Sequence, residues 1–190
     1  MNLKAFFSTL VCSLSLATLN AQNSIPEGYT KATITLANGS TQKGFIKDNI
    51  KKSASVTFVD ESGNNKKTYE GNDINGVTTD AASFICISGD FFKTICNGKL
   101  WFLQKASNAS GKASYNGTEA VFNSGTEGKI GDYFIYADKK LKLINKKSVD
   151  TFINTDLATC TAAVEKAKTI NGDIAKLQEA VDIYNSYTSK

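Results

Sequence analysis

The spacing of apolar residues changes near Asn145, and this change constrains the fold more than any other feature of the sequence. Between Tyr29 and Asn145, short runs such as residues 32–36 alternate apolar with polar side chains, a period of two that is typical of strands. Beyond Asn145, apolar residues recur at the period of about 3.6 that an amphipathic helix requires. Strands followed by helices predict an α+β fold.

The alternating segments are separated by turn residues, which predicts antiparallel hairpins forming a sheet, a roll or a small barrel. Asn97-Gly98 is the clearest turn signal, because this pair favours a type I′ hairpin turn. We place Asp90 in a turn with Ser88 and Gly89. Residues 107–131 predict one or two short strands with long loops. The expected strands are residues 32–36, 41–47, 55–59, 66–70, 83–87, 91–96, 99–104, 132–137 and 141–144.

Two helices are expected after a short one at residues 148–153. Their apolar faces carry Leu157, Cys160, Val164 and Ala167, and then Ile174, Leu177, Val181 and Tyr184. Thr159 and Asp173 are the predicted N-caps, with Asn171-Gly172 as the break. Neither helix is long enough to be stable alone, so both should pack on the fold.

The first residues are typical of a secretory signal peptide. Lys4 precedes the apolar run 5–19, which is shorter than the roughly twenty residues of a membrane span, and Ala21 fits the cleavage rule. We expect residues 1–21 to be a signal peptide, and the mature chain to have no transmembrane segment. In one domain, residues 22–147 would form a β-rich region and residues 148–190 a helical one.

The basic residues argue against several functions. All 22 are lysine, and the sequence has no histidine. Without histidine, Ser-His-Asp and Cys-His catalysis are excluded, and without arginine, specific nucleic-acid recognition is not expected. The lysine pairs 51–52, 66–67, 139–140 and 146–147 are interpreted as solvated turns and protected sheet edges. We expect no cofactor and no metal site.

The carboxylates single out no catalytic pair. Side chains of this type usually cap turns, and the candidates lie at predicted turns or strand ends: Asp60, Glu61, Asp73, Asp90, Glu119, Glu127 and Asp132. The sequence therefore predicts a protein that is not an enzyme.

Three cysteines follow the signal segment. If Gly89-Asp90 is a two-residue turn, Cys86 and Cys96 lie three residues out of register on opposite faces, which disfavours a disulfide between them. A three-residue loop would place them on one face.

The most apolar tract after the signal segment contains Phe91, Phe92, Trp101 and Phe102. These side chains are either the interior of a central hairpin or the contacts of an apolar ligand.

The order of these segments resembles a group of secreted Bacteroidetes proteins of unknown function. The matching motifs are Gly28-Tyr29 with the Asn38–Ile46 segment, the 56–76 segment, Gly98-Lys99-Leu100, the 133–143 hairpin, Cys160 and Tyr184-Asn185. The resemblance implies export to the periplasm or cell surface of a Gram-negative bacterium, and it carries no catalytic activity.

The leading hypothesis is an exported, non-catalytic module that binds another envelope protein or the envelope itself. The first alternative is a barrel or roll that holds a small apolar ligand among its aromatic side chains. The second is a hydrolase that uses two carboxylates.

Overall fold

Ten strands form the main sheet of the computed structural model, which describes residues 25–115 and 119–189. They are β1 (Thr30–Leu36), β2 (Thr41–Asp48), β3 (Ser55–Asp60), β4 (Lys67–Glu70), β5 (Ile74–Thr79), β6 (Ser83–Ile87), β7 (Asp90–Cys96), β8 (Trp101–Lys105), β11 (Tyr133–Ala137) and β12 (Lys140–Ile144). Their order is β12-β11-β8-β7-β6-β5-β1-β2-β3-β4, and all neighbouring pairs are antiparallel.

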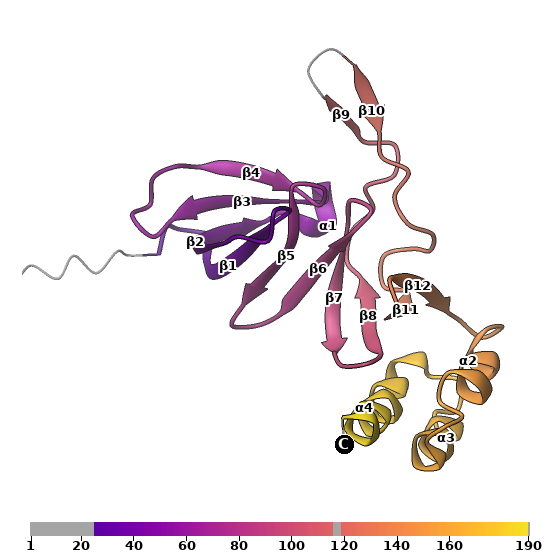
Figure 1. The fold of residues 1–190 in the computed structure, drawn as a ribbon. Coiled ribbons are helices and arrows are strands. Elements are labelled where there is room, and N and C mark those ends of the chain that lie inside the picture. The colour runs from indigo at the N-terminus through magenta and orange to yellow at the C-terminus, as the bar shows by residue number, and fades with distance from the viewer. Residues whose placement is uncertain (1–24, 116–118, 190) are drawn as a thin grey trace, which may run out of the picture.

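The sheet is open, because its edge strands β4 and β12 do not pair with each other (Figure 1). The α+β prediction is confirmed, and of the three arrangements expected from the hairpins the sheet is the one observed. The predicted signal peptide, residues 1–21, lies outside the described residues. Within the described ranges, no helix is long and apolar enough to cross a membrane.

The lysine pairs are exposed as expected. Lys66 and Lys67 lie at the start of the edge strand β4, and Lys139 and Lys140 lie at the start of the edge strand β12. Charged side chains at these positions oppose pairing of the free edges with another chain.

Two four-stranded meanders, β1–β4 and β5–β8, are joined where β5 pairs with β1. A one-turn helix, α1 (Ile50–Ser53), follows β2 and buries Ile50 in the first apolar cluster. That cluster also holds Ile34, Val56, Val77 and Phe91, so it draws on both meanders.

A second, two-stranded sheet interrupts the chain between β8 and β11. Its strands are β9 (Ala113–Tyr115) and β10 (Ala120–Phe122), and Figure 1 shows this hairpin projecting away from the main sheet. The prediction of one or two short strands with long loops over residues 107–131 is therefore confirmed.

The helices follow the last strand. They are α2 (Val149–Thr155), α3 (Thr161–Lys168), the short 3-10 helix η1 (Ile174–Lys176) and α4 (Leu177–Thr188). Asp173 caps η1 by accepting a hydrogen bond from the Ala175 amide at 3.1 Å, as predicted, and Asn171 and Gly172 have positive φ at the break. Thr159 was wrongly predicted as a cap, because Cys160 occupies the N-cap position of α3 and Leu157 precedes the helix.

The helices pack on one face of the C-terminal half of the sheet. The cluster at this interface joins Phe102 and Ile135 of the strands to Leu157, Leu177 and other helical residues. Phe102 stacks on Tyr133, with ring centroids 5.2 Å apart. The apolar faces of the helices are therefore covered by the sheet and by one another.

The turn at Asn97-Gly98 differs from the prediction. Cys96 pairs with Phe102 across a bulge, so residues 97–101 separate the two paired positions. Asn185 of α4 donates to the Leu100 carbonyl at 2.8 Å and accepts from the Leu100 amide at 2.9 Å. A Cβ atom at Gly98 would lie 2.5 Å from Cγ of Asn185. This contact with a distant helix, rather than the local turn preference, sets the loop.

We expect the helices to be indispensable for the folded state. Leu177 is fully buried, so Leu177→Ala should lower the free energy of unfolding by about 2–5 kcal/mol. Gln178→Ala, an exposed neighbour on the same helix, should change it by less than about 0.5 kcal/mol. Chemical denaturation measures both values.

A chain that ends at Lys147 should be unfolded or insoluble, because Phe102, Ile135 and Ile144 lose their cover. Cooperative melting of this fragment near the temperature of the whole chain would contradict the packing argument.

Candidate functional site

The four aromatic residues predicted as ligand contacts do not share one pocket. Phe91 belongs to the cluster around α1, and Phe102 belongs to the cluster under the helices. Phe92 and Trp101 lie together on the opposite face of the C-terminal half of the sheet. Phe91, Phe92 and Phe102 have no exposed surface, whereas Trp101 is partly exposed.

We call the face that carries Trp101 the outer face. Its centre is Phe92, Leu103 and Phe134, all fully buried, and the Phe92 and Phe134 rings meet edge to face at 5.2 Å. Around this centre lie partly buried apolar side chains from four strands, β6, β8, β11 and β12: Ile85, Ile87, Trp101, Tyr136, Leu141 and Leu143. In the described part of the chain, no helical residue belongs to this cluster.

Strand register explains how the outer face is built. Trp101 of β8 lies opposite Tyr136 of β11, which lies opposite Leu141 of β12. The next row, two residues along, contains Leu103, Phe134 and Leu143. Because side chains alternate between the faces of a sheet, Phe102 and Ile135 point the other way, toward the helices.

The same face becomes polar in the N-terminal half of the sheet. By register, Thr33, Thr35, Lys43 and Thr78 continue this side of the sheet through β5, β1 and β2. The apolar cluster around Phe92 is therefore confined to β6, β7, β8, β11 and β12, while Phe45 of β2 and Val59 of β3 are buried as a separate pair on the same side. The polar side chains of β5, β1 and β2 are exposed or partly exposed on this side of the sheet, so this side is not apolar throughout.

A buried ion pair lies at the end of the outer face. Lys105 Nζ is 3.0 Å from Asp90 Oδ2, and both side chains are fully inaccessible to solvent. Asp90 Oδ1 accepts from the Ala109 amide at 2.6 Å, and Oδ2 accepts from the Thr126 amide at 2.8 Å and hydroxyl at 2.6 Å. The expectation that Asp90 lies in a turn was wrong: the turn is Ser88-Gly89, and Asp90 pairs with Ile87 as the first residue of β7.

Lys105 is equally well satisfied. Its ammonium donates to the carbonyls of Thr126, Glu127 and Gly128 at 2.7, 3.1 and 3.3 Å. Asp90 begins β7 and Lys105 ends β8. The pair therefore holds the segment that returns from the β9–β10 hairpin against this end of the two strands. Buried charged residues are common at active sites, but here every charged group is already bonded within the protein, which makes the pair a structural anchor.

The environment of Asp90 also changes its titration. Burial by itself raises the pKa of Asp90, but hydrogen bonds from Thr126, from the Ala109 amide and from Lys105 outweigh it, so the pKa lies below its ordinary value of 3.8. One sign of this role was visible in the sequence: Asp90 directly precedes the apolar segment 91–96, and Lys105 directly follows the apolar segment 99–104.

Three other carboxylates have the predicted turn roles. Asp60 accepts from the amides of Ser62 and Asn64, Asp73 from the Glu70 amide, and Asp132 from the Lys129 amide. Among residues 25–115 and 119–189, no group of three or more Cys, Asp or Glu side chains could hold a metal ion.

The three cysteines of the described residues, Cys86, Cys96 and Cys160, are free thiols. Cys86 lies opposite Phe91, so the hairpin register separates it from Cys96 by more than the three residues predicted. Burial raises the pKa of Cys86 to about 12. Burial, reinforced by the nearby Asp182 carboxylate, raises the pKa of Cys96 to about 12 as well. Such thiols are poor nucleophiles.

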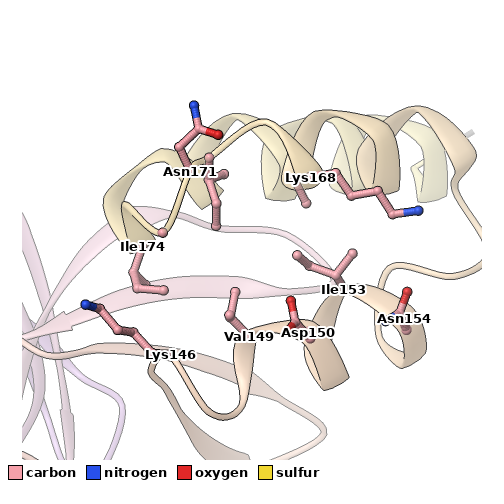
Figure 2. A pocket seen from close by; sticks show the side chains of 11 residues that line it. Lys146, Val149, Asp150, Ile153, Asn154, Lys168, Asn171 and Ile174 are labelled. Carbon is pink, nitrogen blue, oxygen red and sulfur yellow. The ribbon is translucent and has the colours of Figure 1, made fainter.

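A cleft of about 350 Å³ lies between α2 and the turn that joins α3 to η1 (Figure 2). Val149, Ile153, Ile170 and Ile174 form its apolar part. Figure 2 shows Lys146 at one end, beside Ile174, and Lys168 at the other end.

Asp150, Asn154 and Asn171 complete the polar lining of the cleft. None of the aromatic residues predicted as ligand contacts lines it. The sequence prediction missed this cleft because it depends on how three helical segments pack.

No protein family model matches the chain, and comparisons with curated proteins and with solved structures find no match either.

The ion pair should make stability depend on pH. The pKa of Asp90 is lower in the folded state than in the unfolded state. The ionised carboxylate therefore stabilises the fold above about pH 4, and this stabilisation is lost as the pH falls through the folded-state pKa. Asp90→Asn should lower the free energy of unfolding at about pH 7 by about 3–5 kcal/mol and should flatten the loss below about pH 4. Denaturation across this pH range measures both effects.

Asp60→Asn is the matched control. Hydrogen bonds from the Ser62 and Asn65 side chains lower the pKa of Asp60, but this residue lies in an exposed turn. Its substitution should have a much smaller effect at neutral pH. Equal effects of the two substitutions would show that burial of the pair is not decisive.

The thiols should react slowly in the native protein. At neutral pH, Cys86 and Cys96 should be alkylated only after denaturant is added, because thiols with a pKa of about 12 are protonated. Mass spectrometry of peptides from non-reduced protein should find both residues unpaired. A Cys86–Cys96 disulfide peptide would contradict the observed register.

Proposed function

We propose that this protein is an exported, non-catalytic binding module and that its partner is another protein of the cell envelope. The observation that carries the proposal is the outer face, an apolar sheet surface on which no described helix packs and whose rim, with Trp101, Tyr136 and Leu141, is partly exposed around a buried centre. Export and location in the periplasm or at the cell surface are supported by the signal-like residues 1–21 and by the resemblance to secreted proteins.

The shape and composition of the outer face favour a protein partner. Trp101 and Tyr136 are adjacent across two strands, and aromatic side chains of this kind are enriched at protein interfaces. A surface made of rows on a sheet offers a broad contact, whereas small ligands are usually held in concave pockets. Partly exposed apolar side chains that gather on one face are typical of interaction sites.

The two alternatives have less support. A barrel or roll that holds an apolar ligand needs the aromatic side chains around one cavity, whereas this open sheet distributes the four aromatic residues over three clusters. A hydrolase with two carboxylates would need accessible acids, whereas Asp60, Asp73 and Asp132 are engaged in turns and Asp90 is buried in its ion pair.

The test is site-specific cross-linking in cells that export the protein. A photoreactive residue at Trp101 or Leu141 should capture one defined envelope protein. The same residue at Thr33 or Thr78, on the polar half of that side of the sheet, should not.

The captured protein is then purified and titrated with the wild-type chain and with Trp101→Gln. A central aromatic contact contributes at least about 2 kcal/mol, so Trp101→Gln should weaken binding roughly 30-fold while melting stays cooperative. Unchanged affinity, or equal capture from Thr33, would refute the proposal. Binding of lipid vesicles in place of a protein would show that the membrane covers this face.

A further inference from the structure

The cleft between α2 and the α3–η1 turn is separate from the outer face. It is built from helical residues, and those helices pack on the side of the sheet that carries Phe102 and Ile135. Val149, Ile153 and Ile170 are 8%, 5% and 6% exposed, so the cleft exposes narrow strips of apolar surface at its bottom. Its size suits one or two large apolar side chains of a ligand.

Each end of the cleft carries a lysine. Lys142 pairs with Asp156, Lys166 with Glu179, and Lys176 with Asp173. By contrast, within the part of the chain that the structure describes, neither Lys146 nor Lys168 has a carboxylate within ion-pair distance. The two lysines that line the cleft are thus available for anionic groups of a ligand.

We infer that this cleft binds a short acidic peptide segment, in which a large apolar residue is flanked on both sides by carboxylates. The apolar side chain occupies the space between Val149, Ile153 and Ile174, and the flanking carboxylates pair with Lys146 and Lys168 at the two ends (Figure 2). A ligand with one carboxylate could pair with only one of these ends.

The remaining polar groups fit a peptide backbone. Asn154 lies on the α2 wall, and its amide can donate to and accept from peptide groups, whereas the Asn171 amide points away from α2. Asp150 lies in the first turn of α2, where a carboxylate is favourable next to the helix start. It can also accept a hydrogen bond from a peptide amide.

The probe is a labelled peptide with blocked ends, Asp-Glu-Leu-Phe-Glu-Asp, titrated into the full-length protein by fluorescence anisotropy. We expect saturable binding that weakens several-fold when the salt concentration rises, because exposed charge pairs are screened. A peptide with lysines in place of the acids, and one with serines in place of Leu-Phe, should bind at least about tenfold more weakly.

Variants locate the site. K146E/K168E should weaken binding of the acidic peptide at least about tenfold, and K146Q/K168Q should weaken it a few-fold. The control K51E/K139E changes the net charge equally, on exposed lysines outside the cleft, and should leave binding unchanged. Trp101→Gln should also leave it unchanged, which separates this inference from the function proposed for the outer face.

The inference would be overturned by no saturable binding of the acidic peptide, by equal loss of binding in K51E/K139E, or by unchanged binding in both cleft variants. Octanoate that competes with the peptide at equal affinity would also overturn it, because the second carboxylate would then contribute nothing.

Discussion

The buried pair of Asp90 and Lys105 is the interaction on which the rest of the structure depends. Two charges without solvent contact are tolerated only when all their hydrogen-bonding groups are satisfied. Their partners come from the segment that follows β8, through Ala109 and the carbonyls of residues 126–128. The pair therefore fixes where this long excursion leaves and rejoins the sheet. Asp90 directly precedes Phe91 and Phe92, which belong to two of the three apolar clusters, and Lys105 lies opposite Phe92.

The second constraint is that the described helices cover only one face of the C-terminal half of the sheet. Side chains alternate along β8 and β11, so Phe102 and Ile135 lie under the helices while Trp101 and Tyr136 lie on the outer face. Helices α2, α3 and α4 are short, and each needs tertiary contacts to be stable. One face of the sheet supplies those contacts, and the other keeps partly exposed apolar side chains.

Two surfaces of different chemistry follow from this arrangement. The outer face is broad and aromatic, which suits a folded partner, whereas the cleft is small, apolar at its bottom and flanked by lysines, which suits a short acidic segment. The outer face is one side of the C-terminal strands, and the helices that form the cleft pack on the other side. A module of this kind could bind two partners, or two parts of one partner, without rearrangement of its core.

Local patterns in the sequence determined the α+β class, most of the hairpins, the Asp173 cap and the break at Asn171-Gly172, because alternation, helical periodicity and turn chemistry act over a few residues. Contacts between distant residues decided the rest. Asn185 sets the loop at Asn97-Gly98, and Thr126 and Lys105 hold Asp90 in the interior, across separations that no local pattern reports. The two interpretations of the four aromatic residues could not be separated from the sequence, because strand register distributes them over three clusters, with three side chains fully buried and Trp101 partly exposed. The cleft depends only on tertiary structure, because its walls meet through the packing of helices whose relative placement is not encoded in any one segment.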